Sequence, residues 1–167
     1  SPVILFAQPA LSTTAPTVAA ALLQAQERGL RNFYVLSLHK LTPPAMRAIL
    51  DAGEVHIDAV LGPGHVTAIV GAHAWEFLPS DYRIPCAVAG FEPVDILQAI
   101  YLLEQAVQRG QPRVDNPYAR SVRAAGNQVA RALMTRVFAV AVCEEAADHA
   151  TLFDAPCSVR FMPSPFL

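Results

Sequence analysis

Two short segments of this chain share one pattern, and that pattern limits the folds open to it. Leu61-Gly62-Pro63-Gly64-His65-Val66 and, further along, Ala89-Gly90-Phe91-Glu92-Pro93 each combine the end of an apolar run, a tight turn with Gly and Pro, an ionisable side chain and the start of a helical pattern. In an open α/β sheet such turns lie at the carboxyl ends of the strands, where these folds bind ligands. The sequence therefore predicts that two polar loops face one crevice.

The rest of the chain alternates between strand and helix patterns. Apolar runs of strand length are separated by amphipathic stretches, which is typical of a mainly parallel sheet with helices on both faces. We therefore predict an α/β fold with three layers, of the Rossmann-like kind. The expected strands are 3–7, 32–36, 57–61, 86–89 and 137–142, and the expected helices are 16–28, 43–50, 66–70, 93–109 and 125–135. Residues 1–142 should form one domain, residues 143–167 a tail packed on it, and residues 110–116 an exposed connection.

Composition sets the broad class of protein. With 53% hydrophobic and 16% charged residues, a chain of 167 residues can bury a sizeable core. The formal net charge of -2 gives no electrostatic reason to expect a nucleic acid or an anionic membrane as partner. Apolar stretches stay shorter than the roughly 20 residues of a membrane-spanning helix, and the start lacks the basic segment of a secretory signal. We expect a soluble, cytoplasmic protein that binds neither nucleic acid nor membrane.

The cysteines and the first residue add two further expectations. Cys86, Cys143 and Cys157 are an odd number without Cys-x-x-Cys spacing, so they indicate neither a disulfide framework nor a metal site. Cys86 opens a predicted core strand, which favours a buried thiol over a nucleophile. The chain begins with Ser1 and soon enters a strand pattern, which suggests a fragment, a processed form or an engineered chain.

The Gly-Pro-Gly-His turn has a functional and a structural interpretation. Glycines after a strand let the backbone approach a ligand closely, and exposed N–H groups at a helix start favour an anion. Gly62, Gly64 and His65 are therefore candidate ligand-binding residues, although the turn matches neither a P-loop nor a dinucleotide fingerprint. The structural alternative is a tight turn with His65 as its polar cap.

Three polar side chains outside that turn are also candidates. Glu92 is either a general base at the crevice or a carboxylate that stabilises a helix start. His39 follows a strand and could reach the same crevice, but a lone histidine in a polar loop is more often solvated. His65 and Glu92 together suit an acid–base pair, and spacing assigns no Ser-His-Asp arrangement. Trp75 and Phe77 are expected to be a packing pair.

Several distinctive strings occur in one order along the chain: Ser12-Thr13-Thr14-Ala15-Pro16-Thr17, His39-Lys40-Leu41-Thr42-Pro43-Pro44-Ala45-Met46, Gly62-Pro63-Gly64-His65-Val66, Tyr82-Arg83-Ile84-Pro85-Cys86, Ala89-Gly90-Phe91-Glu92-Pro93 and Gly126-Asn127. Together they resemble the HypD family, whose members are scaffolds that assemble the iron-dicyanide-carbonyl unit of nickel-iron hydrogenases. The resemblance covers roughly residues 1 to 142, less than half of a full family member. It implies that the ligand-binding residues are Thr13, Thr14, His39, Gly62, Gly64, His65, Gly90 and Glu92.

The chain also departs from the family pattern. Family members carry Cys-Gly-Gly-His and Gly-Pro-Gly-Cys-Pro-x-Cys segments and a C-terminal region whose cysteines hold an iron-sulfur cluster, and this sequence contains none of them. The first loop reads Ala10-Leu11-Ser12-Thr13-Thr14, whereas the family usually has Gly-Phe-Glu-Thr-Thr. The resemblance therefore implies a truncated maturation domain that has no cofactor or metal of its own and no catalytic competence alone.

Partners and alternatives follow from the same comparison. The resemblance implies a HypC-type chaperone as partner, and an apolar surface left open by missing domains predicts a homodimer. One alternative is a stand-alone module that binds a small molecule or anion with the Gly-Pro-Gly-His and Gly-Phe-Glu-Pro loops. Another is an enzyme that uses His65 and Glu92.

Overall fold

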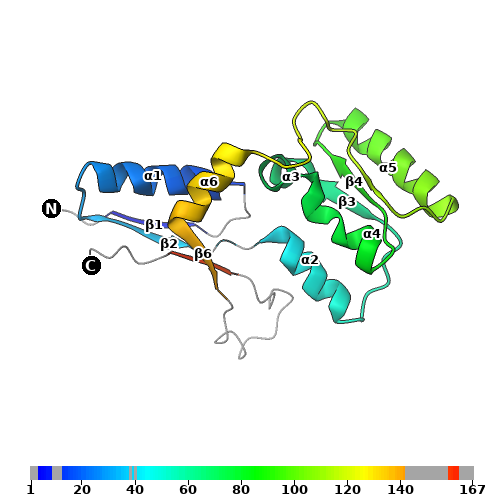
Figure 1. The fold of residues 1–167 in the computed structure, drawn as a ribbon, viewed down its shortest axis with the longest axis horizontal. Coiled ribbons are helices and arrows are strands. Elements are labelled where there is room, and N and C mark those ends of the chain that lie inside the picture. Colours follow the sequence, from blue (N-terminus) through cyan, green and yellow to red (C-terminus); the bar gives the residue numbers. More distant parts are fainter. Residues whose placement is uncertain (1–3, 9–12, 38, 40, 142–157, 162–167) are drawn as a thin grey trace. The chain divides into compact units, whose positions relative to one another are not determined.

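The chain forms two compact units, each with its own strands and helices (Figure 1). Unit 1 comprises Ser1–Gly53 and Val129–Leu167, and unit 2 comprises Glu54–Gln128. The structure is a computed structural model that describes residues 4–8, 13–37, 39, 41–141 and 158–161. No helix in these ranges is both long enough and apolar enough to cross a membrane.

In the part of unit 1 that the structure describes there are two strand pairs and three helices. β1 and β2 pair in parallel, and β6 and β7 pair antiparallel. α1 buries Ala15, Val18 and Ala19 against Val137 and Phe138, a spacing that places the three α1 residues on one helix face. The elements are β1 (Ile4–Gln8), α1 (Ala15–Glu27), β2 (Phe33–Ser37), α2 (Thr42–Asp51), α6 (Gln128–Val137), β6 (Phe138–Ala141) and β7 (Ser158–Phe161).

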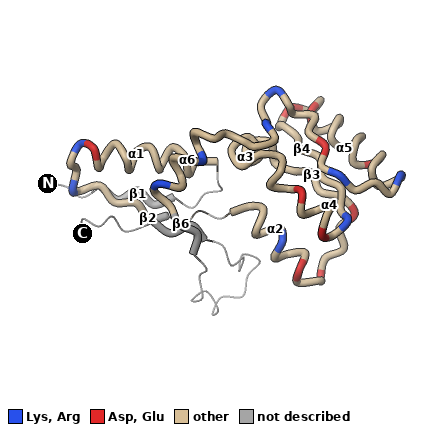
Figure 2. Tube along the Cα trace, viewed as in Figure 1, with Lys and Arg blue, Asp and Glu red and all other residues tan. Residues whose placement is uncertain are grey.

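Unit 2 contains a three-stranded parallel sheet in the order β3-β4-β5, with helices packed against it. In Figure 2, acidic and basic residues are interspersed along this unit. Its elements are β3 (Val60–Pro63), α3 (Gly64–Val70), the 3-10 helix η1 (Ala72–Trp75), α4 (Phe77–Asp81), β4 (Cys86–Ala89), α5 (Pro93–Gln108) and β5 (Val114–Asp115).

The central strand β4 is buried along its whole length. Ala87 and Ala89 pack against Ala99 and Leu103 of α5, and these small side chains let the helix approach the strand closely. Cys86 alternates onto the other face and is fully buried as well. Burial raises the pKa of its thiol to about 12, from an ordinary value of 9.0. The predicted buried, structural thiol is confirmed.

The predicted α/β class with mainly parallel strands is confirmed, but the boundaries of some elements differ. β3 begins at Val60, not at residue 57. The register pairs Val60 with Cys86, and the preceding residues of the partner strand cannot extend the ladder, because Arg83 has a φ of 58° and Pro85 lacks an N–H. The predicted exposed connection at 110–116 contains β5, which pairs with β4.

Helices η1 and α4 lie between the expected helix at 66–70 and the expected strand at 86–89, a stretch for which the sequence predicts no helix. Pro79 is tolerated because it lies in the first turn of α4, where backbone N–H groups have no partner within the helix. Trp75 and Phe77 stack with ring centroids 6.4 Å apart, so the predicted packing pair is confirmed. The predicted boundary at residue 142 lies outside the described residues, and a single domain over 1–142 stays a prediction.

Candidate functional site

The two predicted loops leave neighbouring parallel strands at the same edge of the unit 2 sheet. Pro63 at the end of β3 is in register with Ala89 at the end of β4. α3 begins directly at Gly64, and Glu92 is the residue before α5. Side chains of both loops meet there, because the His65 and Phe91 rings pack edge to face with centroids 4.7 Å apart.

One aromatic ring covers the glycines of both loops. A Cβ atom on Gly64 would lie 2.8 Å from the Tyr118 ring and would collide with the carbonyl oxygen of Ala89. A Cβ atom on Gly90 would lie 2.7 Å from the same ring and would collide with the Asp95 carboxylate. Both positions therefore require glycine because protein atoms pack against them.

Gly62 also serves packing within the sheet. A Cβ atom there would lie 3.2 Å from Sγ of Cys86 on the neighbouring strand. At all three glycine positions of these loops, side chains and backbone of unit 2 therefore occupy the space next to the glycine, where the sequence predicts a ligand.

Arg120 fastens the segment that carries Tyr118 to the start of α5. Its two terminal nitrogens donate to the two carboxylate oxygens of Asp95, each at 2.6 Å, and Nη2 also donates to Oε2 of Glu92 at 3.0 Å. The guanidinium lies 4.4 Å from the centroid of the Tyr118 ring. Bidentate pairing and stacking on a ring together fix the guanidinium in one orientation.

This contact decides the electrostatics of the edge. The hydrogen bonds from Arg120 hold the pKa of Asp95 below its ordinary value of 3.8, and the Asp95 carboxylate raises the pKa of Arg120. Asp95 is buried, whereas the Glu92 side chain is 75% exposed. Glu92 and His65, the predicted acid–base pair, have different partners in the structure, namely Arg120 and Phe91.

The buried Thr67 hydroxyl fixes the Gly-Pro-Gly-His turn by hydrogen bonds. Thr67 Oγ1 donates to the Pro63 carbonyl oxygen at 2.7 Å and accepts from Nε1 of Trp75 at 2.9 Å. Thr67 and Trp75 are both fully buried. The last residue of β3 and the first turn of α3 are therefore tied to η1.

The segment with Tyr118 and Arg120 is anchored at its far end to the α3–η1 junction. Gly71 and Gly126 have φ values of 93° and 72°, and a Cβ atom on either would collide with the backbone of the other segment. Asn127 N–H donates to the Ile69 carbonyl oxygen at 3.1 Å, and His73 N–H donates to that of Ala124 at 3.1 Å. The Gly126-Asn127 string of the resemblance thus has a structural role at this anchor.

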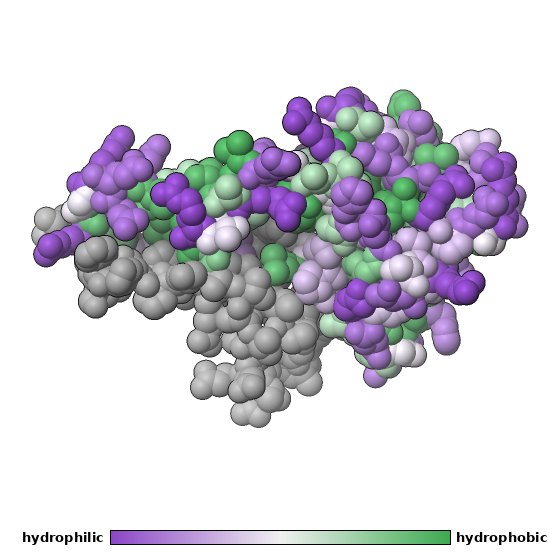
Figure 3. Space-filling view, viewed as in Figure 1, coloured by the Kyte–Doolittle hydropathy of each residue, from purple (hydrophilic) through white to green (hydrophobic). Residues whose placement is uncertain are grey.

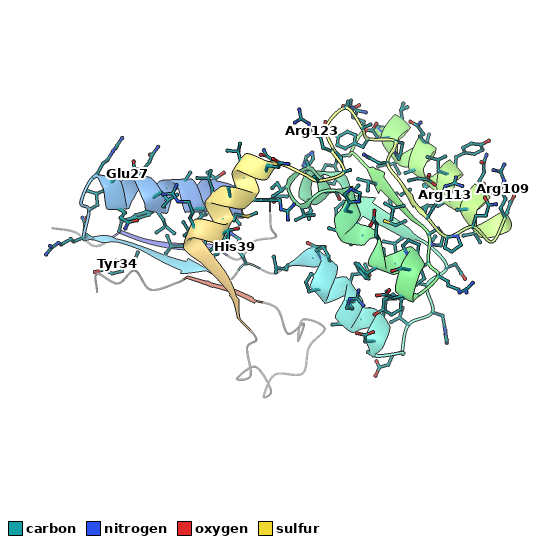
Figure 4. The ribbon with its side chains drawn as sticks, viewed as in Figure 1. Glu27, Tyr34, His39, Arg109, Arg113 and Arg123 are labelled. Atoms are coloured by element: carbon teal, nitrogen blue, oxygen red, sulfur yellow. The ribbon has the colours of Figure 1, made fainter. Side chains whose placement is uncertain are left out.

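The remaining candidates belong to unit 1. Thr14 Oγ1 and His39 Nε2 lie 3.4 Å apart, and Thr13 is half-buried nearby in sequence. His39 is fully buried and its ring contacts Phe138 at 5.7 Å, so the expectation of a solvated loop histidine is wrong. Figure 4 shows His39 beside the junction of α6 and β6. Burial lowers its pKa from the ordinary 6.5.

Asp95, Tyr118 and Arg120 are the site residues that the sequence analysis missed. Asp95 occupies the third position of α5, where an acidic residue is common in any helix. Tyr118 and Arg120 lie in an irregular segment. Arg120 meets Asp95 across 25 residues and the Tyr118 ring lies against Gly64 and Gly90, so no local pattern indicates either residue. Among the described residues, no three His, Cys, Asp or Glu side chains are placed to hold a metal ion.

Comparison with known proteins adds sequence relatives to this geometry. The family model HypD, described as the hydrogenase formation hypA family, matches residues 2–145. The hydrogenase maturation factor HypD of Azotobacter vinelandii is 43% identical over 131 residues, which covers 75% of this chain and 35% of that protein. HypD of Escherichia coli (strain K12) is 38% identical over 166 residues, with coverages of 92% and 44%. The chain thus spans less than half the length of either relative.

Proposed function

Because this chain belongs to the HypD family, we propose that it acts in hydrogenase maturation as one part of the scaffold that assembles the iron-dicyanide-carbonyl unit. The observation that carries the proposal is the family match over residues 2–145, which includes both loops and the Gly126-Asn127 anchor. Activity would then need further parts of the maturation machinery, since the chain spans less than half of its relatives.

The geometry supports a positioning role for this part. The family's iron-sulfur cluster is held by cysteine thiolates, and Cys86, the cysteine within the described residues, does not fit a ligand because it is buried with a pKa of about 12. The chemistry of that cluster is therefore not assigned to any described residue. What the loops offer is a fixed set of exposed groups at one edge of the sheet.

The partner that we propose is a HypC-type chaperone, docked where His65 and Phe91 meet. Phe91 is 73% exposed although it is aromatic, and it continues into exposed apolar residues of α5, among them Val94 and Leu97. Figure 3 shows apolar surface between hydrophilic residues over this helix. A contiguous apolar surface with a polar rim is typical of a protein interface. A homodimer through the same surface is the competing assembly.

The other predictions have weaker support from the geometry. A small molecule or anion at the two loops would have to displace the Tyr118 ring from Gly64 and Gly90. An acid–base role for Glu92 would have to compete with its contact to Arg120. Both interpretations stay predictions.

Anaerobic mixing with a HypC-type chaperone, followed by light scattering on a sizing column and iron analysis of the peak, tests the proposal. We expect a complex with the wild type and with Val129→Ser, which removes an apolar side chain of similar exposure (72%) from unit 1. Phe91→Ser should lose the complex. A wild-type chain that stays uncomplexed, or an equal loss in both variants, would contradict the docking surface. The mass of the chain alone decides between monomer and homodimer.

A further inference from the structure

A cavity of about 260 Å³ lies at the opposite edge of the unit 2 sheet from the two loops. Asp58 precedes β3, Pro85 precedes β4 and Pro112 precedes β5, so the cavity opens at the amino ends of all three strands. Ala106 and Val107, in the last turn of α5, also line it. We propose that this cavity binds a small zwitterion, namely an α-amino acid with an aliphatic side chain.

Two opposite charges line the cavity without pairing. Asp58 and Arg83 both contribute to the lining, and among the described residues neither side chain has an ion pair or hydrogen bond, with the other or with any third group. Asp58 and Arg83 are both exposed, and two opposite charges that do not neutralise each other are complementary to a molecule that carries both signs. A carboxylate would face Arg83 and an ammonium group would face Asp58.

The backbone at Arg83 is the second observation. α4 ends with Tyr82 and Ile84 both donating to the Leu78 carbonyl oxygen, and the residue between them, Arg83, has a φ of 58°. Helices commonly end on such a left-handed residue, and glycine is the one that adopts it without strain. Arginine is therefore an unfavourable choice for the turn itself. Arg83 lines the cavity, so a side chain at this position contributes to the site although it disfavours the turn.

Size and lining narrow the class of ligand. A volume of about 260 Å³ is near the lower end of small-molecule sites, about 300 Å³, which suits one amino acid and not a nucleotide. The end of α5 carries partial negative charge and favours an ammonium group. Arg109 and Arg113 lie at this end of unit 2 (Figure 4), and Arg113 is already paired with Asp115 at 2.9 Å. Pro85, Ala106, Val107 and Pro112 are the apolar residues of the lining, and an aliphatic side chain would contact them.

An NMR titration of the ¹⁵N-labelled chain with L-leucine tests the site, with the amide of Gly110, another lining residue, as reporter. We expect saturable shifts. The matched analogues 4-methylpentanoate, which lacks the ammonium group, and 3-methylbutylamine, which lacks the carboxylate, should each bind at least about tenfold more weakly. Absence of saturable leucine binding, or an analogue that binds as tightly as leucine, would overturn the proposal.

Two variants separate binding from folding. Arg83→Gly should weaken leucine binding at least about tenfold while its Tm equals or exceeds that of the wild type, because glycine relieves the positive φ. Asp58→Asn should weaken leucine binding to a similar extent, and Val129→Ser in unit 1 should leave it unchanged. If either lining variant kept wild-type affinity, or if Arg83→Gly lowered the Tm, the argument would fail.

Discussion

Removal of the buried Thr67 hydroxyl tests how the Gly-Pro-Gly-His turn is held in place. The hydroxyl donates to the Pro63 carbonyl oxygen and accepts from the Trp75 indole, at 2.7 and 2.9 Å. Thr67→Val keeps the branched shape of the side chain and leaves a buried N–H and a carbonyl without this partner. Each such buried group costs about 1–3 kcal/mol, so we expect the two together to lower the free energy of unfolding by about 2–6 kcal/mol.

Two companion variants isolate the hydroxyl from the methyl group and from the indole. Thr67→Ser keeps the hydroxyl and loses one methyl, which should cost only about 1 kcal/mol. Trp75→Phe removes the indole N–H that donates to Thr67. In the double variant with Thr67→Val, only the Pro63 carbonyl oxygen then loses its bond to position 67, and no indole N–H is left unpaired. The double variant should therefore cost about 1–3 kcal/mol less than the sum of the two single variants.

Urea denaturation is the assay. Trp75 is the single tryptophan of the chain, so its fluorescence reports on unit 2 directly, and circular dichroism serves for the phenylalanine variants. The reasoning is refuted if Thr67→Val loses less than about 0.5 kcal/mol, the range of neutral surface changes, or loses no more than Thr67→Ser. Strict additivity in the double variant would refute the Thr67–Trp75 bond in particular.

Three further predictions concern the glycines and the two perturbed pKa values. Gly64→Ala should destabilise unit 2 by about 1–3 kcal/mol in urea denaturation, since the new Cβ would collide with Ala89 and Tyr118. The control Gly29→Asn, at a positive-φ position with no atom near the new Cβ, should cost less, and equal losses in the two variants would contradict the packing at Gly64. Arg120→Met should raise the pKa of Asp95, measured by carboxyl NMR, because it removes the hydrogen bonds that hold this pKa low; an unchanged pKa would contradict this. In the wild type the lowered pKa contributes stability that is fully present above pH 3.8 and is lost as the pH falls through the folded-state pKa of Asp95. Because burial lowers the pKa of His39, the stability that its neutral ring contributes is fully present above pH 6.5 and is lost as the pH falls below that value. His39→Gln should therefore make the free energy of unfolding depend less on pH between about pH 7.5 and 5. A variant whose stability depends on pH as steeply as that of the wild type would contradict the burial of a neutral His39.

The elements whose bounds the sequence predicts best are those with a proline or glycine at their ends. Strand β4 is predicted over 86–89 and found at Cys86–Ala89, and α5 is predicted over 93–109 and found at Pro93–Gln108. Pro85 and Pro93 mark their starts, because a residue without an N–H cannot continue a ladder but is well suited to the first turn of a helix. The two loops between such markers are therefore placed at the strand ends by local sequence alone.

The contacts that fill the space above those loops depend on the fold and have no local signal. Arg120 reaches Asp95 across 25 residues, and His39 is buried by contact with Phe138, which is far away in sequence. A two-residue strand such as β5 is too short to show a period of two. In each case the deciding partner lies outside any window over which periodicity or turn chemistry is read.

Because the Tyr118 ring covers Gly64 and Gly90, these glycine-rich turns are expected to contribute to binding through their exposed side chains and not through their backbone. A turn open to solvent would bind a ligand through its own backbone, and ordering it would reduce the affinity. Here the turn is already ordered by Thr67 from one side and by the Tyr118–Arg120 segment from the other. A protein that contacts Phe91 and His65 would meet groups held in place before binding, so little of the interaction energy is lost to ordering them. If a partner docks there, Thr67, which is fully buried, would affect its affinity through the geometry of the loops without being part of the contact surface itself.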